Sequence, residues 1–116
     1  MENYGFVKCA IATINSKLSN PVDAAEKIIG LVRQAESQNV KVLIFPELSL
    51  TGYTCQDLFG YSQLMDSVMQ SLWQLRCLSG YHKNVLFVIG APIIVSDTLY
   101  NCAVVFQGKK IIGVVP

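Results

Sequence analysis

The most informative pattern in this sequence is Val42-Leu43-Ile44-Phe45-Pro46-Glu47-Leu48-Ser49-Leu50-Thr51-Gly52-Tyr53. Its apolar, β-branched start is typical of a buried strand, and Thr51-Gly52 is typical of a turn. An ionised carboxylate at the end of a buried strand must be solvated, paired or used. Ligands of open α/β sheets bind at the carboxyl ends of the strands. We therefore predict that Glu47 is a functional residue.

Strands and helices are predicted to alternate along the chain. One helix begins at Asn20-Pro21, where Asn is a good N-cap and Pro suits the first helical position, and it ends at Gln38-Asn39. A second helix is predicted over 62–78, because apolar residues recur there on one helical face. The predicted strands cover 7–14, 40–46, 84–91, 100–106 and 110–115.

The order β-α-β-α-β-β-β predicts an α/β fold with a mixed sheet. Strands that alternate with helices pair in parallel through right-handed crossovers, so the first three strands are expected to be parallel. The last two strands are expected to form an antiparallel hairpin through a tight turn at 107–109. A flavodoxin-like sheet fits residues 1–95 equally well, so periodicity alone leaves the architecture open.

The composition excludes several classes of function. The 116 residues have room for one domain, 1–116, and the chain is 52% hydrophobic and 15% charged, which indicates strands buried on both faces. The net charge is +1 without a basic patch, so neither nucleic acid nor a membrane is an expected partner. The longest apolar run, 85–95, is too short to span a bilayer, and the N-terminus does not resemble a signal peptide.

The four cysteines do not form a metal-binding motif. They lie at positions 9, 55, 77 and 102, without the spacing of a zinc site, and His82 is the only histidine. No metal site is therefore predicted. Cys9 and Cys102 fall within apolar strands, where a free cysteine behaves as a small hydrophobe. Four reduced thiols suit a cytoplasmic protein.

Three segments together resemble a known family. They run from Pro46 to Phe59 (PELSLTGYTCQDLF), from Tyr4 to Lys8 (YGFVK) and from Leu99 to Ala103 (LYNCA). They resemble the nitrilase (carbon-nitrogen hydrolase) superfamily, and within it most closely the N-terminal glutaminase domains of glutamine-dependent NAD synthetases. The resemblance implies the first part of an αββα sandwich, in which two mixed sheets lie face to face with helices outside.

The resemblance also implies a chemistry. These enzymes cleave carbon-nitrogen bonds other than peptides with a Glu-Lys-Cys triad, in which the thiolate attacks the carbonyl carbon. The glutamate acts as general base and then as acid, and the lysine stabilises the oxyanion. Glu47 matches the glutamate. A free glutamate has a pKa of about 4.3, so a base that works near neutral pH needs surroundings that raise that pKa.

The other two triad members have no match in the sequence. In this branch the lysine follows the Val-Val-Pro with which the sequence stops, and the cysteine lies further on. Lys109 and Lys110 are expected to be solvated at the hairpin turn, and Cys55 does not match the position of the nucleophile. We therefore expect an N-terminal fragment of a longer domain, without glutaminase activity of its own.

The implied function is hydrolysis of glutamine to supply ammonia for NAD formation. No cofactor is expected in the fragment, whereas ATP and magnesium are expected for the synthetase domain of the parent enzyme. Tyr53 either lines the glutamine pocket or packs beside the turn, and Asn101 either holds a loop near the site or only starts a strand. A homo-oligomer is expected, since uncovered sheet edges and apolar faces favour self-association. Another superfamily amidase and a non-catalytic α/β binding or assembly module are the alternatives.

Overall fold

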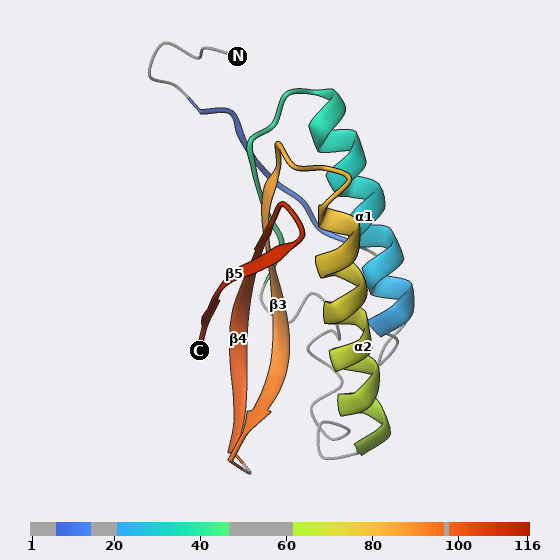
Figure 1. The fold of residues 1–116 in the computed structure, drawn as a ribbon. Coiled ribbons are helices and arrows are strands. Elements are labelled where there is room, and N and C mark those ends of the chain that lie inside the picture. The colour runs from blue at the N-terminus through green and yellow to red at the C-terminus, as the bar shows by residue number, and fades with distance from the viewer. Residues whose placement is uncertain (1–6, 15–20, 47–61, 97) are drawn as a thin grey trace.

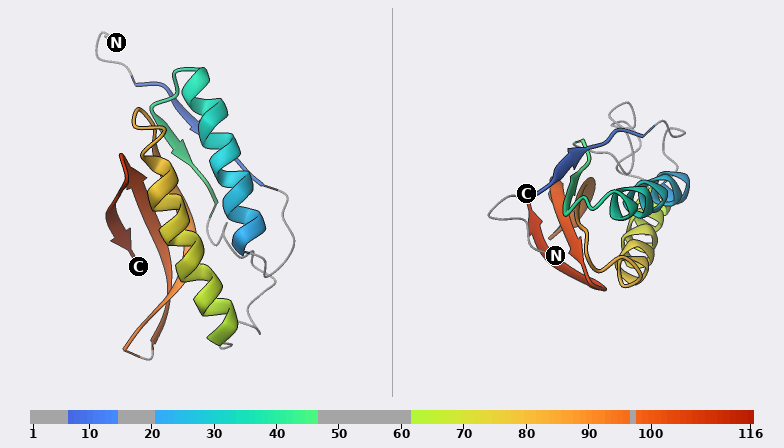
Figure 2. Two further views of the ribbon diagram at one scale, coloured as in Figure 1. Left: turned by 45° about the vertical axis from the view of Figure 1, so that its right-hand side comes forward. Right: turned by 90° about the horizontal axis from the view of Figure 1, so that it is seen from above.

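The computed structural model describes residues 7–14, 21–46, 62–96 and 98–116. Its elements are β1 (Cys9–Ile11), α1 (Pro21–Ser37), β2 (Val42–Ile44), α2 (Ser62–Ser79), β3 (Leu86–Val95), β4 (Thr98–Gln107) and β5 (Lys110–Val115). The strands form one sheet in the order β1-β2-β3-β4-β5, and both helices cover the same face of it (Figures 1 and 2). The predicted α/β class and the order of the elements are confirmed.

The sheet is mixed, as predicted. β1, β2 and β3 are parallel, and β4 and β5 continue as an antiparallel meander. The turn between β4 and β5 places Gly108 (φ 60°) and Lys109 (φ 71°) in the left-handed region, as a two-residue type I′ hairpin requires. Lys109 and Lys110 are exposed at this turn, as expected.

Helix α1 ends where the sequence predicted. Asn39 adopts a left-handed conformation (φ 62°) just after the helix. The N–H of Val40 donates to the carbonyl of Ala35 (3.0 Å), and the N–H of Asn39 donates to that of Glu36 (3.1 Å). This pair of bonds is a Schellman motif, which satisfies the last carbonyls and turns the chain into β2.

Strand β3 is longer than predicted, because it runs through Pro92 to Val95. The N–H of Leu86 donates to Lys41 and the carbonyl of Val88 accepts from Phe45, both at 2.9 Å, so the main-chain groups of these even-numbered residues face β2. The nitrogen of Pro92 faces the same side, but pairing with β2 stops at Val88. The proline therefore interrupts no bond of the ladder. β1 and β2, in contrast, are shorter than predicted, with three residues each.

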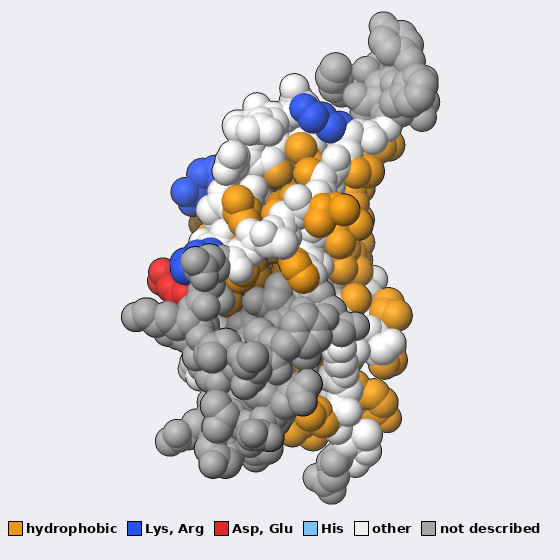
Figure 3. Space-filling model, turned by 180° about the vertical axis from the view of Figure 1, so that it is seen from behind, with side chains coloured by type: hydrophobic (Ala, Val, Ile, Leu, Met, Phe, Trp, Pro, Cys, Tyr) orange, Lys and Arg blue, Asp and Glu red, His pale blue; other side chains and the backbone are white. Residues whose placement is uncertain are grey.

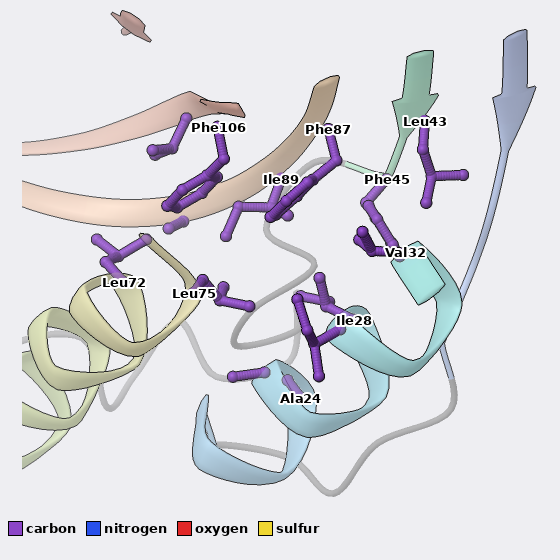
Figure 4. Packing of buried hydrophobic residues seen from close by; sticks show 14 of the residues in the cluster. Ala24, Ile28, Val32, Leu43, Phe45, Leu72, Leu75, Phe87, Ile89 and Phe106 are labelled. Carbon is purple, nitrogen blue, oxygen red and sulfur yellow. The ribbon is translucent and has the colours of Figure 1, made fainter. Parts of the chain in front are cut away.

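The core lies between the helices and one face of the sheet (Figure 4). Rings of Phe87 and Phe106 stack in its centre, with centroids 5.0 Å apart. The helices add apolar side chains at helical spacing: Ala24, Ile28 and Val32 from α1, and Val68, Leu72 and Leu75 from α2. We call this side of the sheet the helix-covered face. Trp73 and Met69 are 63% and 57% exposed, so they are not core residues.

Candidate functional site

The opposite side of the sheet, which we call the open face, carries a hollow beside the end of β2. Side chains alternate along a strand, so Ile44, Val88 and Ala103 point away from the helices while their neighbours point toward them. The hollow has a volume of about 330 Å³. The described residues that line it are Ile44, Phe45, Pro46, Val88, Ile89, Gly90, Asn101, Cys102, Ala103, Val115 and Pro116.

The strand register explains why the surface is hollowed here. Gly90 of β3 pairs with Ala103 of β4, which in turn pairs with Val115 of β5. Gly90 has no side chain and Ala103 has only a methyl group, so two adjacent positions of the open face stay low. Larger side chains, among them Ile44 and Val88, surround them. The depression therefore results from the pairing of small residues on neighbouring strands.

The described lining of the hollow contains few polar side chains. Among the lining residues that the structure describes, no side chain is charged and Asn101 supplies the only carboxamide. Cys102 belongs to the helix-covered face, where it is 5% exposed. Burial raises the pKa of the Cys102 thiol, which keeps it protonated and therefore a poor nucleophile. A carboxylate that enters such apolar surroundings is expected to have a raised pKa.

The chain reaches this hollow at the end of strand β2. The N–H of Phe45 donates to the carbonyl of Val88 (2.9 Å), and its ring is buried in the core. Pro46 then lines the hollow. The predicted base Glu47 is the next residue in the sequence, but Glu47, Tyr53 and Cys55 lie outside the described residues. Of the candidate site residues that the structure describes, only Asn101 lines the hollow.

Sequence reasoning missed the partner of His82. The imidazole Nδ1 lies 2.8 Å from Oε1 of Glu36, which belongs to α1 and is separated from His82 by 46 positions. The pair ties the end of α1 to the loop that follows α2. No local pattern signals it, because the carboxylate comes from a distant segment.

Two further properties follow from the described part of the chain. Its histidine, cysteine and acidic side chains do not gather in groups of three or more that could hold a metal ion. Neither α1 nor α2 is long and apolar enough to cross a membrane.

Comparison with known sequences identifies relatives of the whole segment. The family model described as carbon-nitrogen hydrolase matches residues 8–115. The chain is 33% identical over 112 residues to the glutamine-dependent NAD(+) synthetase of Mycobacterium leprae, and 33% identical over 91 residues to that of Dictyostelium discoideum. These alignments include 97% and 78% of this chain. The chain spans only 16% and 13% of the length of the two relatives.

Solved structures share the fold. A glutamine-dependent NAD(+) synthetase from Cytophaga hutchinsonii superposes with a TM-score of 0.83 at 21% identity, over 93% of this chain and 18% of that one. The corresponding enzyme from Acinetobacter baumannii gives 0.79 at 28% identity, over 93% and 20%. An amidase from Nesterenkonia sp. AN1 gives 0.81 at 15% identity, over 94% and 42%.

These matches settle the architecture that periodicity left open. The sheet of five strands and its two helices superpose on nitrilase-like structures, which confirms the predicted nitrilase-like α/β fold. The family model covers nearly all of the sequence, including the strands that line the hollow. The chain belongs to the carbon-nitrogen hydrolase family.

Proposed function

We propose that the chain is the N-terminal part of the glutaminase domain of a glutamine-dependent NAD synthetase. The observation that supports this proposal is that β2 ends beside a hollow on the open face whose described lining contains no charged side chain. The residue that follows this strand end, Glu47, is the one that matches the family's general base. The similarity to NAD synthetases over 97% of the chain supports this branch of the family.

In the proposed reaction Glu47 takes the proton of a cysteine thiol, returns a proton to the departing ammonia and then activates water. The apolar lining suits this role, because it favours a carboxyl group whose pKa lies closer to neutrality than 4.3, the approximate value for free glutamate. None of the described lining residues can replace the lysine or the thiolate of the triad. We assign those two groups to other segments of the synthetase.

The remaining parts of the proposal concern the whole enzyme. Glutamine is its substrate, and Tyr53 is assigned to the glutamine pocket. ATP and magnesium serve its synthetase domain, which acts as the ligase that consumes the ammonia. We further propose that the enzyme is a cytoplasmic homo-oligomer.

A chimeric enzyme tests this proposal. The matching 113 residues of the Mycobacterium tuberculosis synthetase, to which the chain is 33% identical, are replaced by this chain. NAD formation is then measured with glutamine and, separately, with added ammonia as nitrogen source. We expect both activities in the chimera. The variant Glu47→Gln is expected to lose at least about a hundredfold with glutamine, in line with the loss of a general base, and little with ammonia.

The ammonia-dependent reaction serves as the internal control for folding. A chimera that uses ammonia normally but not glutamine would contradict the proposal, as would a Glu47→Gln variant with full glutamine-dependent activity. Loss of both activities indicates misassembly, and a second exchange into the Mycobacterium leprae synthetase, also 33% identical, then repeats the test.

A second candidate function is that of a free-standing amidase of the same family. The Nesterenkonia amidase favours it, because the chain covers 42% of that structure with a TM-score of 0.81. The two candidates differ in the enzyme that the segment can complete after exchange. The synthetase reading predicts that the exchanged segment supports glutamine-dependent NAD formation, whereas the amidase reading predicts activity only after exchange into an amidase.

A further inference from the structure

The polar and apolar parts of the hollow lie in separate rows of the open face. One row pairs Gly90 of β3 with Ala103 of β4, and the next row pairs Pro92 with Asn101. Rows on one face lie about 6.8 Å apart, because an antiparallel strand rises about 3.4 Å per residue. Asn101 therefore marks one end of a low apolar floor that the two strands form by their own register.

The carboxamide of Asn101 is available to a ligand. Asn101 is exposed, and it belongs to the open face because the next residue, Cys102, is buried on the helix-covered face. No hydrogen bond between described residues uses its side chain. Pro92, its partner in the ladder, has no polar side-chain atom. A carboxamide offers donors and an acceptor together, so Asn101 suits a ligand group that also has both.

The described lining favours the uncharged end of a small ligand. The hollow of about 330 Å³ lies at the small end of ligand pockets, which span roughly 300–1,000 Å³. A charged group that enters apolar surroundings without a partner loses its hydration at a high cost. Glutamine has a neutral carboxamide at one end and an ammonium and a carboxylate group at the other. Its carboxamide end is therefore the one that suits this lining.

We propose that Asn101 binds the side-chain carboxamide of glutamine, and that the methylene groups of the substrate lie on the floor formed by Gly90 and Ala103. The inference rests on the proposed function. Nδ2 of Asn101 donates to the substrate carbonyl, and Oδ1 accepts from the substrate NH₂ group. Gly90 has no side chain and Ala103 has only a methyl group, so an extended aliphatic chain lies flat against the sheet between Asn101 and the end of β2.

The same two bonds distinguish the substrate from its product. Hydrolysis replaces the amide of glutamine by the carboxylate of glutamate. That carboxylate accepts from Nδ2 of Asn101 but has no hydrogen for Oδ1, which then faces a negatively charged oxygen. A site that hydrogen-bonds one group rejects an analogue that leaves its own polar atoms unpaired. Asn101 therefore favours release of glutamate.

The chimeric synthetase that tests the proposed function also tests this inference. Asn101→Leu keeps the approximate size of the side chain but removes both hydrogen bonds. The KM for glutamine should rise roughly ten- to a hundredfold with little change in kcat, as expected when ground state and transition state lose the same contacts. NAD formation from ammonia should not change. The matched control Gln107→Leu removes another carboxamide of β4, outside the described lining, and should leave KM unchanged.

An uncharged competitor shows which end of glutamine Asn101 binds. Butyramide has a primary carboxamide on a three-carbon chain and lacks the ammonium and carboxylate groups. It should inhibit glutamine-dependent NAD formation competitively. Asn101→Leu should raise its inhibition constant by the same factor as the KM for glutamine. An inhibition constant that stays the same in the variant would place Asn101 at the charged end and overturn the inference.

A second pair of variants tests the floor. Ala103→Val adds two carbon atoms to the floor, so the KM for glutamine should rise by at least about tenfold, because a well-fitted site tolerates added bulk poorly. Val105→Ile adds one carbon atom on the same face of the same strand, outside the described lining, and should leave KM unchanged. Equal KM values for Ala103→Val and the unmodified chimera would show that the substrate does not use this floor.

The outcomes separate this inference from the proposed function. An unmodified chimera that uses ammonia but not glutamine would refute the proposed function, and the inference with it. If the unmodified chimera uses glutamine, an unchanged KM in Asn101→Leu refutes the inference alone. A lower kcat at unchanged KM also refutes it, because Asn101 then acts on the reacting groups without binding the amide. Should Asn101→Leu lose the ammonia-dependent activity as well, Asn101→Ala, which only removes atoms, is measured with the same expectations.

Discussion

The two faces of the sheet have similar composition but different surroundings. On the helix-covered face, Phe87, Ile89 and Val104 are fully buried. On the open face, Ile44 is 43% and Val115 is 59% exposed. Figure 3 shows hydrophobic side chains gathered along the right-hand side of the view and into its middle. Large apolar patches on a protein surface mark interaction sites. The open face therefore has the character of an inner layer of a larger assembly.

This contrast explains why the chain is unusually apolar. A sheet with one solvated face shows alternation of apolar and polar residues, whereas β3 is apolar on both faces. The helices of this chain cover one face only. The candidate hollow lies on the other face, the one that α1 and α2 leave uncovered.

The largest difference between the faces is expected in thiol reactivity. Cys9 is exposed on β1, whereas Cys102 is buried on the helix-covered face of β4. We expect iodoacetamide to alkylate Cys9 at least about a thousandfold faster, because Cys102 reacts only after an opening that costs several kcal/mol. Pulsed alkylation followed by peptide mass spectrometry measures both rates in one sample.

The free energy of unfolding, measured by urea denaturation at several alkaline pH values, tests the electrostatics of Cys102. Burial raises the pKa of its thiol above the ordinary value of 9.0, so the folded state favours the protonated form. The resulting contribution to stability is fully present below pH 9 and is lost as the pH rises through the higher folded-state pKa. Replacement by serine or alanine should flatten this alkaline loss. Equal alkylation of Cys9 and Cys102 in the native protein would show that the core is open.

A matched pair of isoleucines gives the next largest contrast. Ile89 and Ile44 lie on neighbouring strands of the same sheet but on opposite faces, with 0% and 43% exposure. Ile89→Ala should lower the free energy of unfolding by about 2–5 kcal/mol, because it leaves a cavity in the core. Ile44→Ala should cost below about 1 kcal/mol. Urea denaturation at low protein concentration measures both, and equal losses would mean that the open face is covered in solution.

A buried serine links the helix layer to the β4–β5 hairpin. The hydroxyl of Ser79 donates to the carbonyl of Arg76 (2.6 Å) and accepts from the N–H of Lys109 (2.9 Å). Ser79→Ala leaves that N–H without its partner, so we expect a loss of about 1–3 kcal/mol. Amide hydrogen exchange at Lys109 should rise more than at core residues of β3. Unchanged exchange at Lys109 would argue against this bond.

The local features of the fold were predictable from sequence, and the long-range ones were not. Asn39 and Gly108 tolerate the left-handed conformations that they adopt, so the end of α1 and the hairpin turn lie where predicted. The extension of β3 through Pro92 depends on where β2 stops, which no local pattern contains. The bond between His82 and Glu36 was missed for the same reason.

The same distinction between local and long-range features applies to the candidate site. The sequence predicted that a strand would end at Pro46 before a carboxylate, and the structure brings Pro46 to the hollow. The hollow itself was not predicted, because it needs Gly90 opposite Ala103, and that register becomes visible only when β3 and β4 are paired. The roles of Glu47 and Tyr53 stay predictions.

The smallest predicted effect has the opposite sign and comes from the helix that contains Ser79. Ser71 is also fully buried in α2, but its hydroxyl has no hydrogen-bond partner in the structure. Ser71→Ala removes an unsatisfied polar group and adds helix propensity, so we expect stabilisation by about 0.5–1 kcal/mol. Urea denaturation of Ser71→Ala beside Ser79→Ala gives the comparison within one helix. Destabilisation by Ser71→Ala would mean that this hydroxyl has a hydrogen-bond partner in solution.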